Sequence, residues 1–563
     1  MRGPDESYLS SPRYGYDFVV SVTEESINAT IKQHLASLEA PQVAQCYVDD
    51  GGREVGITLK ELQDKSGGVN PFDIPHGTDV KDARFENLNN ARFLRGWRAR
   101  LGLAPMTDVF KTKNLVELNA NATSVKFDMQ CAEFQVVAYI EGGRFGKDKW
   151  INVAQKKDHP WIFKSVVDLT SRTLHWNDGG QQLPSDVQDK IKDMQRESGE
   201  KVFDIEQLIM DLENAKLAAT VPELEGVEKG TPEYTMLQET FLGTYFQKLK
   251  EKGDPLLNCT IKRMSEQGPE PTLRLTDFRY GVSPYVDGKG EPVKDPTEDQ
   301  RVAATLNYLC AADGNKLPPA VPFTWNWVDT SELDNHHGVI SISRNSLAGY
   351  FAPKLLQIAK PMCFKPKIYM KVTNDTDTDL STDFSEVDDT ATLDLQPTGS
   401  KVLSLAWSSK QYYAETWWGL YQRTTQTHYW IDVYFEGTTV TIKQRFVLYF
   451  KAKENVWWGE ANIADKSRTD VYHLAVNDRG KLEAKTSFTE EDNSKKLDLW
   501  LPWFSDYIEQ EQSKKLRVKV ASLTQLPLNV VQDYVFPGGR AFVFKDVDFS
   551  LHQDLISRIT YAD

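Results

Sequence analysis

The stretch Asp17-Phe18-Val19-Val20-Ser21-Val22-Thr23-Glu24-Glu25 joins two kinds of local structure. Its first part is a run of apolar and β-branched side chains, which favour an extended strand. Thr23 is a typical N-cap residue, and the two glutamates after it suit the positive end of a helix dipole. An apolar stripe at helical spacing follows, formed by Ile27, Ile31, Leu35 and Leu38. The sequence therefore predicts a short strand that runs directly into an amphipathic helix.

A second stretch of the same design lies 320 residues further along the chain. Gly338-Val339-Ile340-Ser341-Ile342-Ser343 is again a β-favouring run that ends in a capping residue. Pro353 predicts a kink or a late start in the helix after it. The apolar side of that helix is formed by Leu347, Phe351, Leu355 and Ile358. Two interpretations stay open: two copies of one domain design, or a chance likeness between capped helices that follow strands.

Length and composition set the broad class of the protein. A chain of 563 residues with 40% hydrophobic side chains predicts two to four folded domains or subdomains. The net charge of -15 argues against a nucleic-acid partner, which would need a basic surface. The sequence contains neither a signal-like apolar segment at its start nor a run of about 18 apolar residues, so we expect a soluble protein without a transmembrane segment. Five scattered cysteines suit a reducing, cytoplasmic location, although a signal peptide removed earlier is also compatible with the sequence.

The remaining chain is mostly of β character. Alternating apolar residues predict antiparallel strands over residues 116–154 and 401–487. For residues 201–250 the pattern instead predicts a helical or mixed insertion, and for residues 373–392 it predicts an acidic, solvated loop. At the end of the chain we expect a strand from Ala541 to Phe544, followed by a short helix.

Three short motifs resemble the TULIP (tubular lipid-binding) superfamily, and within it the subfamily encoded beside bacterial neurotoxin genes. They are Tyr14-Gly15-Tyr16-Asp17 with the following strand and Ser26-Ile27-Asn28, the segment from Phe203 to Leu212, and Phe536-Pro537-Gly538-Gly539. Tyr16 departs from the pattern, because Trp is expected at that position. The motifs are spread over nearly the whole chain, but each of them is short.

The resemblance implies an α+β, β-rich fold. It implies two elongated units, residues 1–320 and 321–563, each with a curved antiparallel sheet wrapped around a long helix. An apolar groove for a lipid would lie between helix and sheet. The residues that face this groove or the core would be Ile27, Ile31, Leu35, Leu347, Phe351 and Leu355.

An acidic cluster is the sharpest local pattern that could bind a metal. Asp375, Asp377, Asp379, Asp383 and Glu386 occupy five liganding positions of an EF-hand-like calcium loop. Leu380 stands where the loop needs glycine, and a strand-like segment precedes the cluster, so a solvated loop is the competing interpretation. We therefore expect no cofactor, with calcium as the exception to test.

The leading functional hypothesis is non-enzymatic binding or carriage of a lipid or other apolar ligand. No motif for a hydrolase, zinc protease or phosphate loop occurs in the sequence. One alternative is an enzyme of cyclase or isomerase type that positions an apolar substrate in the same groove. Another is a carbohydrate-binding or assembly subunit that uses exposed tryptophans, and protein partners stay open. The tryptophans concerned are Trp325, Trp327, Trp417, Trp418, Trp457, Trp458, Trp500 and Trp503.

Overall fold

The structure is a computed structural model of the chain. It describes residues 2–37, 42–103, 114–118, 124–140, 142, 147–157, 160–175, 192, 203–217, 224–225, 231, 234, 256–263, 273–374, 377–383, 386–388, 390–415, 421–454, 457–495, 535–537 and 542–561.

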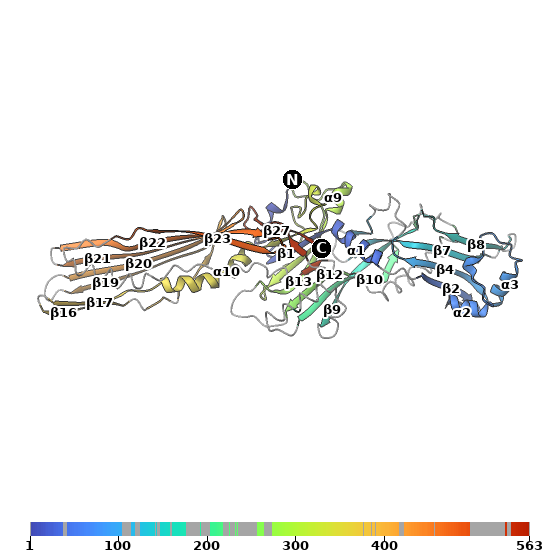
Figure 1. Ribbon diagram of the computed structural model, residues 1–563, viewed down its shortest axis with the longest axis horizontal. Helices are drawn as coiled ribbons and strands as arrows, with labels where there is room; N and C mark the ends of the chain where they lie inside the picture. Colours follow the sequence, from blue (N-terminus) through green and yellow to red (C-terminus); the bar gives the residue numbers. More distant parts are fainter. Residues whose placement is uncertain are drawn as a thin grey trace.

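A sheet at the centre of the elongated molecule joins the beginning, the middle and the end of the chain (Figure 1). Each of its strands is antiparallel to its neighbours. All residues of the three middle strands are buried, so both faces of the sheet are covered there. In spatial order the strands are β13 (Leu275–Ser283), β14 (Thr305–Ala312), β1 (Phe18–Thr23), β15 (Gly338–Ile342), β27 (Leu555–Tyr561) and β25 (Phe542–Phe544), with β26 (Asp548–Phe549) paired to β27.

The two predicted strand–helix units meet in this central sheet. β1 continues into α1 (Glu24–Ser37), and β15 into α10 (Arg344–Ala359). Because β1 and β15 are antiparallel, with Val20 opposite Ile340, the two helices leave the sheet in opposite directions (Figure 1). Gly338 allows this close pairing, since a Cβ at that position would lie 2.0 Å from the carbonyl oxygen of Ser21. The predicted cap of the first helix is confirmed: the backbone N–H of Ser26 donates to Thr23 Oγ1 at 3.2 Å.

On the α1 side, the molecule ends in a five-stranded antiparallel sheet. A second sheet lies between it and the centre. The end sheet has the order β3 (Glu54–Thr58), β2 (Gln42–Asp49), β4 (Phe93–Leu101), β7 (Cys131–Ile140) and β8 (Lys149–Ala154), with α2 (Leu59–Lys65), the 3-10 helix η2 (Pro71–Asp73) and α3 (Ala83–Asn90). The second sheet has the order β24 (Val535–Pro537), β12 (Leu256–Arg263), β10 (Phe203–Leu217), β9 (Ile162–His175), β6 (Ser124–Met129) and β5 (Val116–Leu118), with β11 (Leu224–Glu225) on β9.

On the α10 side, one long antiparallel sheet and a hairpin form the opposite end of the molecule (Figure 1). The sheet has the order β18 (Asp394–Leu395), β19 (Lys401–Glu415), β20 (Tyr421–Glu436), β21 (Thr439–Glu454), β22 (Trp457–Val476) and β23 (Leu482–Asp492). The hairpin consists of β16 (Lys367–Asn374) and β17 (Asp377–Asp383). Shorter elements complete the described chain: η1 (Pro4–Glu6), α9 (Glu298–Val302), η5 (Thr330–Glu332) and η6 (Lys360–Met362).

Two buried carboxylates tie distant parts of the chain together around the central sheet. Asp554 accepts hydrogen bonds from the backbone N–H of Leu9 at 2.6 Å, from Ser7 Oγ at 2.9 Å and from the backbone N–H of Arg344 at 2.9 Å. It thereby joins the N-terminal segment, the first residue of α10 and the last strand. Glu24, at the start of α1, accepts from the backbone N–H of Leu118 at 2.8 Å. Burial raises the pKa of Asp554 to about 7 and that of Glu24 to about 8.

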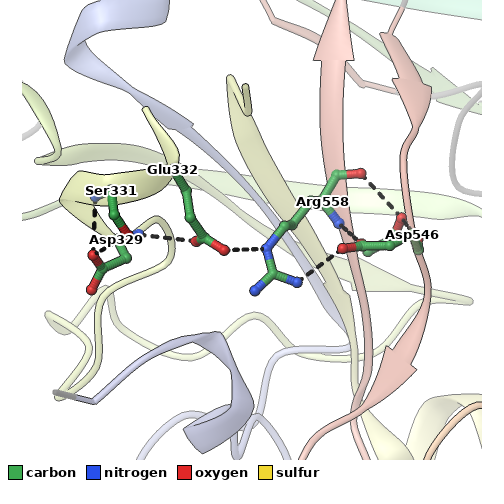
Figure 2. Close-up of polar contacts among 6 residues, drawn as sticks. Asp329, Ser331, Glu332, Asp546 and Arg558 are labelled. Carbon is green, nitrogen blue, oxygen red and sulfur yellow. Dashed lines mark hydrogen bonds and ion pairs between the residues drawn. The ribbon is translucent and has the colours of Figure 1, made fainter. Parts of the chain in front are cut away.

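A network of polar side chains at the surface also holds the last strand, β27 (Figure 2). The guanidinium of Arg558, on β27, donates to Glu332 at 2.9 Å and to Asp546 at 2.9 Å. Glu332 also accepts from the backbone N–H of Asp329, whose own carboxylate accepts from Ser331. Arg558 is about a quarter exposed, so this pairing adds orientation more than stability.

Four sequence expectations need correction. Residues 203–217 form strand β10 and not a helix, because β9 and β12 pair with it on both sides and satisfy its backbone. The final helix is instead β27, which pairs with β15. Residues 377–383 of the expected acidic loop form β17. The long helix is not supported, since α10 has 16 residues while β22 has 20. The β-rich, antiparallel character is confirmed, and the division at residue 320 stays a prediction.

The raised pKa of Glu24 predicts how stability depends on pH. A carboxyl group whose pKa is raised by folding stabilises the folded state below its unfolded pKa, and that stabilisation is lost as pH rises through the folded pKa. The free energy of unfolding should therefore decrease between pH 5 and 8. In Glu24→Gln this decrease should be smaller by about 1–3 kcal/mol. Denaturant unfolding at several pH values measures it. Glu61→Gln is the control, because hydrogen bonds from Thr58 lower the pKa of Glu61 and keep it ionised throughout this range. Equal pH slopes in wild type and Glu24→Gln would contradict the assignment.

Candidate functional site

The apolar side of α10 is buried against the long sheet. Leu347, Phe351 and Leu355 are at most 1% exposed and belong to the main hydrophobic core. Phe351 meets Phe435 of β20 edge-on, with ring centroids 6.2 Å apart. These predicted groove residues therefore pack in the core between helix and sheet, which is the more common fate of a helical apolar stripe.

The corresponding residues of α1 lie in the same continuous core. Ile27 and Ile31 are at most 4% exposed, whereas the side chain of Leu35 lies outside the described residues. Asn28 fixes α1 to β5, because its side chain accepts from the backbone N–H of Val116 at 2.8 Å and donates to the carbonyl of the same residue at 2.8 Å. The helix is thus held by both apolar and polar contacts.

The long sheet extends well beyond the helix that covers it. α10 has 16 residues and spans about 24 Å. β20 and β21 have 16 residues each and span about 53 Å, and β22 with 20 residues spans about 66 Å. Figure 1 shows α10 along the part of the sheet near the centre of the molecule, and the β16–β17 hairpin along the rest of the sheet to its far end. The inner face therefore continues past the end of the helix.

Alternate residues make this inner face apolar along β21 and along the second half of β20. All of them are at most 2% exposed, while their neighbours in sequence point outward. On β20 they are Tyr429, Ile431, Val433 and Phe435, and on β21 they are Val440, Ile442, Phe446, Leu448, Phe450 and Ala452. Phe364, just after α10 and η6, covers part of the face with its ring 5.5 Å from that of Phe446.

A few polar groups interrupt the apolar inner face. Tyr429 donates to Gln444 at 2.7 Å, and Thr427 donates to the carbonyl of Phe364 at 3.0 Å. Thr425, two residues before Thr427, is fully buried, and its hydroxyl has no hydrogen-bond partner among the described residues. Leaving such a hydroxyl unpaired costs about 1–3 kcal/mol. Arg423, two residues before Thr425, is also buried, and its guanidinium donates to the carbonyl of Lys453 at 3.0 Å. The face thus combines a large apolar area with a few polar groups, the composition typical of sites for apolar ligands.

Strand alternation already predicted which way these threonines point. Thr425 and Thr427 share the parity of Tyr429 and Ile431, so the pattern places them on the inner face. What the pattern could not reveal is that one hydroxyl finds a partner and the other does not, because that partner comes from a residue more than 60 positions away.

No reactive group stands out along the inner face in the described part of the chain. Cys363 is buried and free, and burial raises the pKa of its thiol to about 12, which makes it unreactive. Asp470 forms an ion pair with Arg468 at 2.8 Å. His337 lies elsewhere, at the central sheet, and its Nδ1 accepts from the backbone N–H of Tyr561 at 3.0 Å. Each of these groups has a structural role.

The acidic cluster does not form a loop where the structure describes it. Asp377, Asp379 and Asp383 lie on β17, where alternate residues are about 6–7 Å apart along the chain. Glu386 forms an ion pair with Lys367, and Asp375 lies outside the described residues. An EF-hand loop must curve its ligands around one ion, which an extended strand cannot do. Among described residues, no group of three or more metal-ligating side chains comes together.

The tryptophans divide between core and surface. Trp325 and Trp327 are at most 3% exposed and pack edge-on, 5.4 Å apart, in a second hydrophobic cluster. Trp458 is 62% exposed, with the ammonium of Lys451 5.4 Å from its ring. Trp325 and Trp327 are therefore core residues, whereas Trp458 is on the surface, as the carbohydrate-binding alternative requires. The side chains of Trp417, Trp418, Trp457, Trp500 and Trp503 lie outside the described residues.

Comparison with known proteins adds a structural likeness. No protein-family model and no curated protein matches the chain. It is similar to the solved structure of P47 of Clostridium botulinum E1, at 11% identity and a TM-score of 0.42, over 98% of this chain and 100% of that one. It is also similar to a lipopolysaccharide binding protein, at 8% identity and a TM-score of 0.32, over 97% and 99%. These two structures agree with the resemblance read from the sequence motifs, but at such TM-scores they imply nothing about a ligand.

The two neighbouring threonines allow a matched test of the inner face. Thr425→Val removes an unpaired buried hydroxyl and should leave the free energy of unfolding unchanged or raise it by up to about 1 kcal/mol. Thr427→Val removes a hydroxyl that donates to Phe364 and should lower it by about 1 kcal/mol. Urea unfolding of both variants measures the difference. If Thr425→Val is as destabilising as Thr427→Val, the hydroxyl of Thr425 has a partner.

Proposed function

We propose that this chain is a non-enzymatic protein that binds or carries a lipid or another apolar ligand. The ligand would lie on the inner face of the β19–β23 sheet beyond the end of α10, where the β16–β17 hairpin follows the helix along the sheet. One observation carries the proposal: the buried apolar residues of β21 extend from Val440 to Ala452, over about 40 Å, whereas α10 spans about 24 Å.

The dimensions of this face suit an extended hydrocarbon chain. About 30–40 Å of sheet continues beyond α10, by the strand and helix rises given above. Burying one CH₂ group contributes about 0.8 kcal/mol, so a chain of 14 such groups would gain about 11 kcal/mol before the entropy of ordering is subtracted. The unpaired hydroxyl of Thr425 would offer such a ligand one polar contact.

We infer further that the two strand–helix units come from one duplicated design. The positions matched at an offset of 320 residues, Val20 and Ile340, are also opposite each other across the β1–β15 ladder. This register is what a local two-fold axis through that pair requires. The duplication supports the proposal by giving each end of the molecule a helix that packs on a sheet.

To test the proposal, the protein is purified without detergent and then extracted with an organic solvent. The extracted molecules are identified by mass spectrometry. A matched pair of variants locates the site. Leu448→Asn places a polar group on the inner face, whereas Tyr449→Asn, the next residue on the same strand, changes the outer face. We expect Leu448→Asn to lower the amount of extracted lipid, and the uptake of a fluorescent fatty acid, several-fold, and Tyr449→Asn to leave both unchanged.

Circular dichroism spectra and thermal melting establish whether both variants are folded. If Leu448→Asn does not fold, Ala452→Phe narrows the same face without a polar group and should give the same loss of lipid. A wild-type extract without apolar molecules, together with no uptake of the fatty acid, would overturn the proposal.

A further inference from the structure

A cavity of about 310 Å³ lies on the end sheet at the other end of the molecule. It crosses β2, β4, β7 and the chain just after β8, beside the cap formed by α2, η2 and α3. Arg98, Arg100 and Lys157 contribute to its lining, and Glu133 is the acidic residue among its lining residues. The excess of positive charge stands out in a chain of net charge -15.

The register of the strands explains why the basic residues gather here. Arg98 is opposite Gln135, and Arg100 is opposite Glu133, across the β4–β7 ladder. Residues two apart on a strand point to the same face, so both arginines are on the side of the sheet where α2, η2 and α3 pack. Lys157 lies three residues after the end of β8, the strand that pairs with β7. Two separate parts of the chain, β4 and the segment after β8, are thus needed to build the charge.

Arg98 is held in place before any ligand arrives. Its Nε donates to Gln135 Oε1 at 2.5 Å, and its guanidinium carbon lies 5.3 Å from the ring centroid of Phe72. Gln135 is fixed in turn, because its amide donates to the carbonyl of Phe72 at 3.0 Å and to Asn152 at 2.6 Å. With Nε used for orientation, the two terminal nitrogens of Arg98 have no hydrogen-bond partner among the described residues. An oriented guanidinium of this kind matches the two oxygens of a phosphate or carboxylate.

The other basic groups are only weakly neutralised. Arg100 and Glu133 are 3.6 Å apart and both well exposed, a geometry that contributes little. Lys157 is exposed and forms no ion pair with any residue the structure describes. The positive charge is therefore available to a ligand.

We propose that this cavity is a binding site for an oxyanion, a phosphate group in particular. Arg98 would bind two of its oxygens, with Arg100 and Lys157 supplying further charge. The cavity holds a small phosphorylated molecule or the head group of a phospholipid, and both present the same chemistry. The site is independent of the apolar ligand proposed above, which concerns the sheet at the opposite end.

The test uses the full chain and isothermal titration calorimetry at constant ionic strength. Inorganic phosphate and pyrophosphate are titrated first, with sodium chloride as the blank. Vesicles of phosphatidylcholine with and without 20% phosphatidic acid are compared by sedimentation. We expect saturable binding of one phosphate-class ligand, and a loss of about tenfold or more in affinity for Arg98→Met and Lys157→Met.

Arg95→Met is the matched control, because Arg95 is on the same strand and pairs with Glu54 at 2.7 Å outside the cavity lining. It should bind like the wild type. Lys157→Met keeps the test decisive if Arg98→Met lowers the melting temperature strongly. Binding of phosphatidic acid vesicles alone, lost in both cavity variants, supports the site and identifies a head group as the ligand. Binding by none of the probes, or equal loss in Arg95→Met, would overturn the proposal.

Discussion

The antiparallel pairing of β1 with β15 is the interaction on which the rest of the molecule depends. Its residues are all buried, and α1 and α10 begin directly after the two strands, so the pairing sets the directions of both ends of the molecule. The paired residues are 320 positions apart, and closing such a loop costs about 5 kcal/mol of chain entropy. Burial of the apolar strand residues offsets this cost, and Gly338 removes the one side chain that would prevent the approach.

Buried carboxylates around this pairing serve as hydrogen-bond acceptors for backbone groups that have no partner in a strand or helix. Asp17 accepts from the backbone N–H of Ala312 at 2.7 Å, and Asp554 accepts from two such groups on different segments. Desolvation of Asp554 opposes its ionisation and raises its pKa, while its hydrogen bonds favour ionisation. The centre of the molecule is therefore specified by polar contacts as well as by packing, and the two ends of the chain are joined there.

The two proposed binding sites lie at opposite ends, away from this centre. Their chemistry differs because the sheets differ: the long sheet presents apolar residues inward along two strands, whereas the end sheet places arginines and glutamines on one exposed face. In both cases, β-strand alternation supplies the side chains that line one face of a sheet. A rigid centre with functional ends is consistent with the way binding groups are held by regular structure in other proteins.

The local pattern of side chains along the sequence was sufficient to predict much of the fold. The first strand, the Thr23 cap, the two amphipathic helices and the alternation on residues 429–450 follow from side-chain spacing and capping chemistry, and the structure has them. Tertiary structure decided the rest. Residues 203–217 and 555–561 became strands because distant strands satisfy their backbones. The unpaired hydroxyl of Thr425 and the gathering of Arg98 with Lys157 depend on neighbours far away in sequence, and spacing along the chain carries no information about such neighbours.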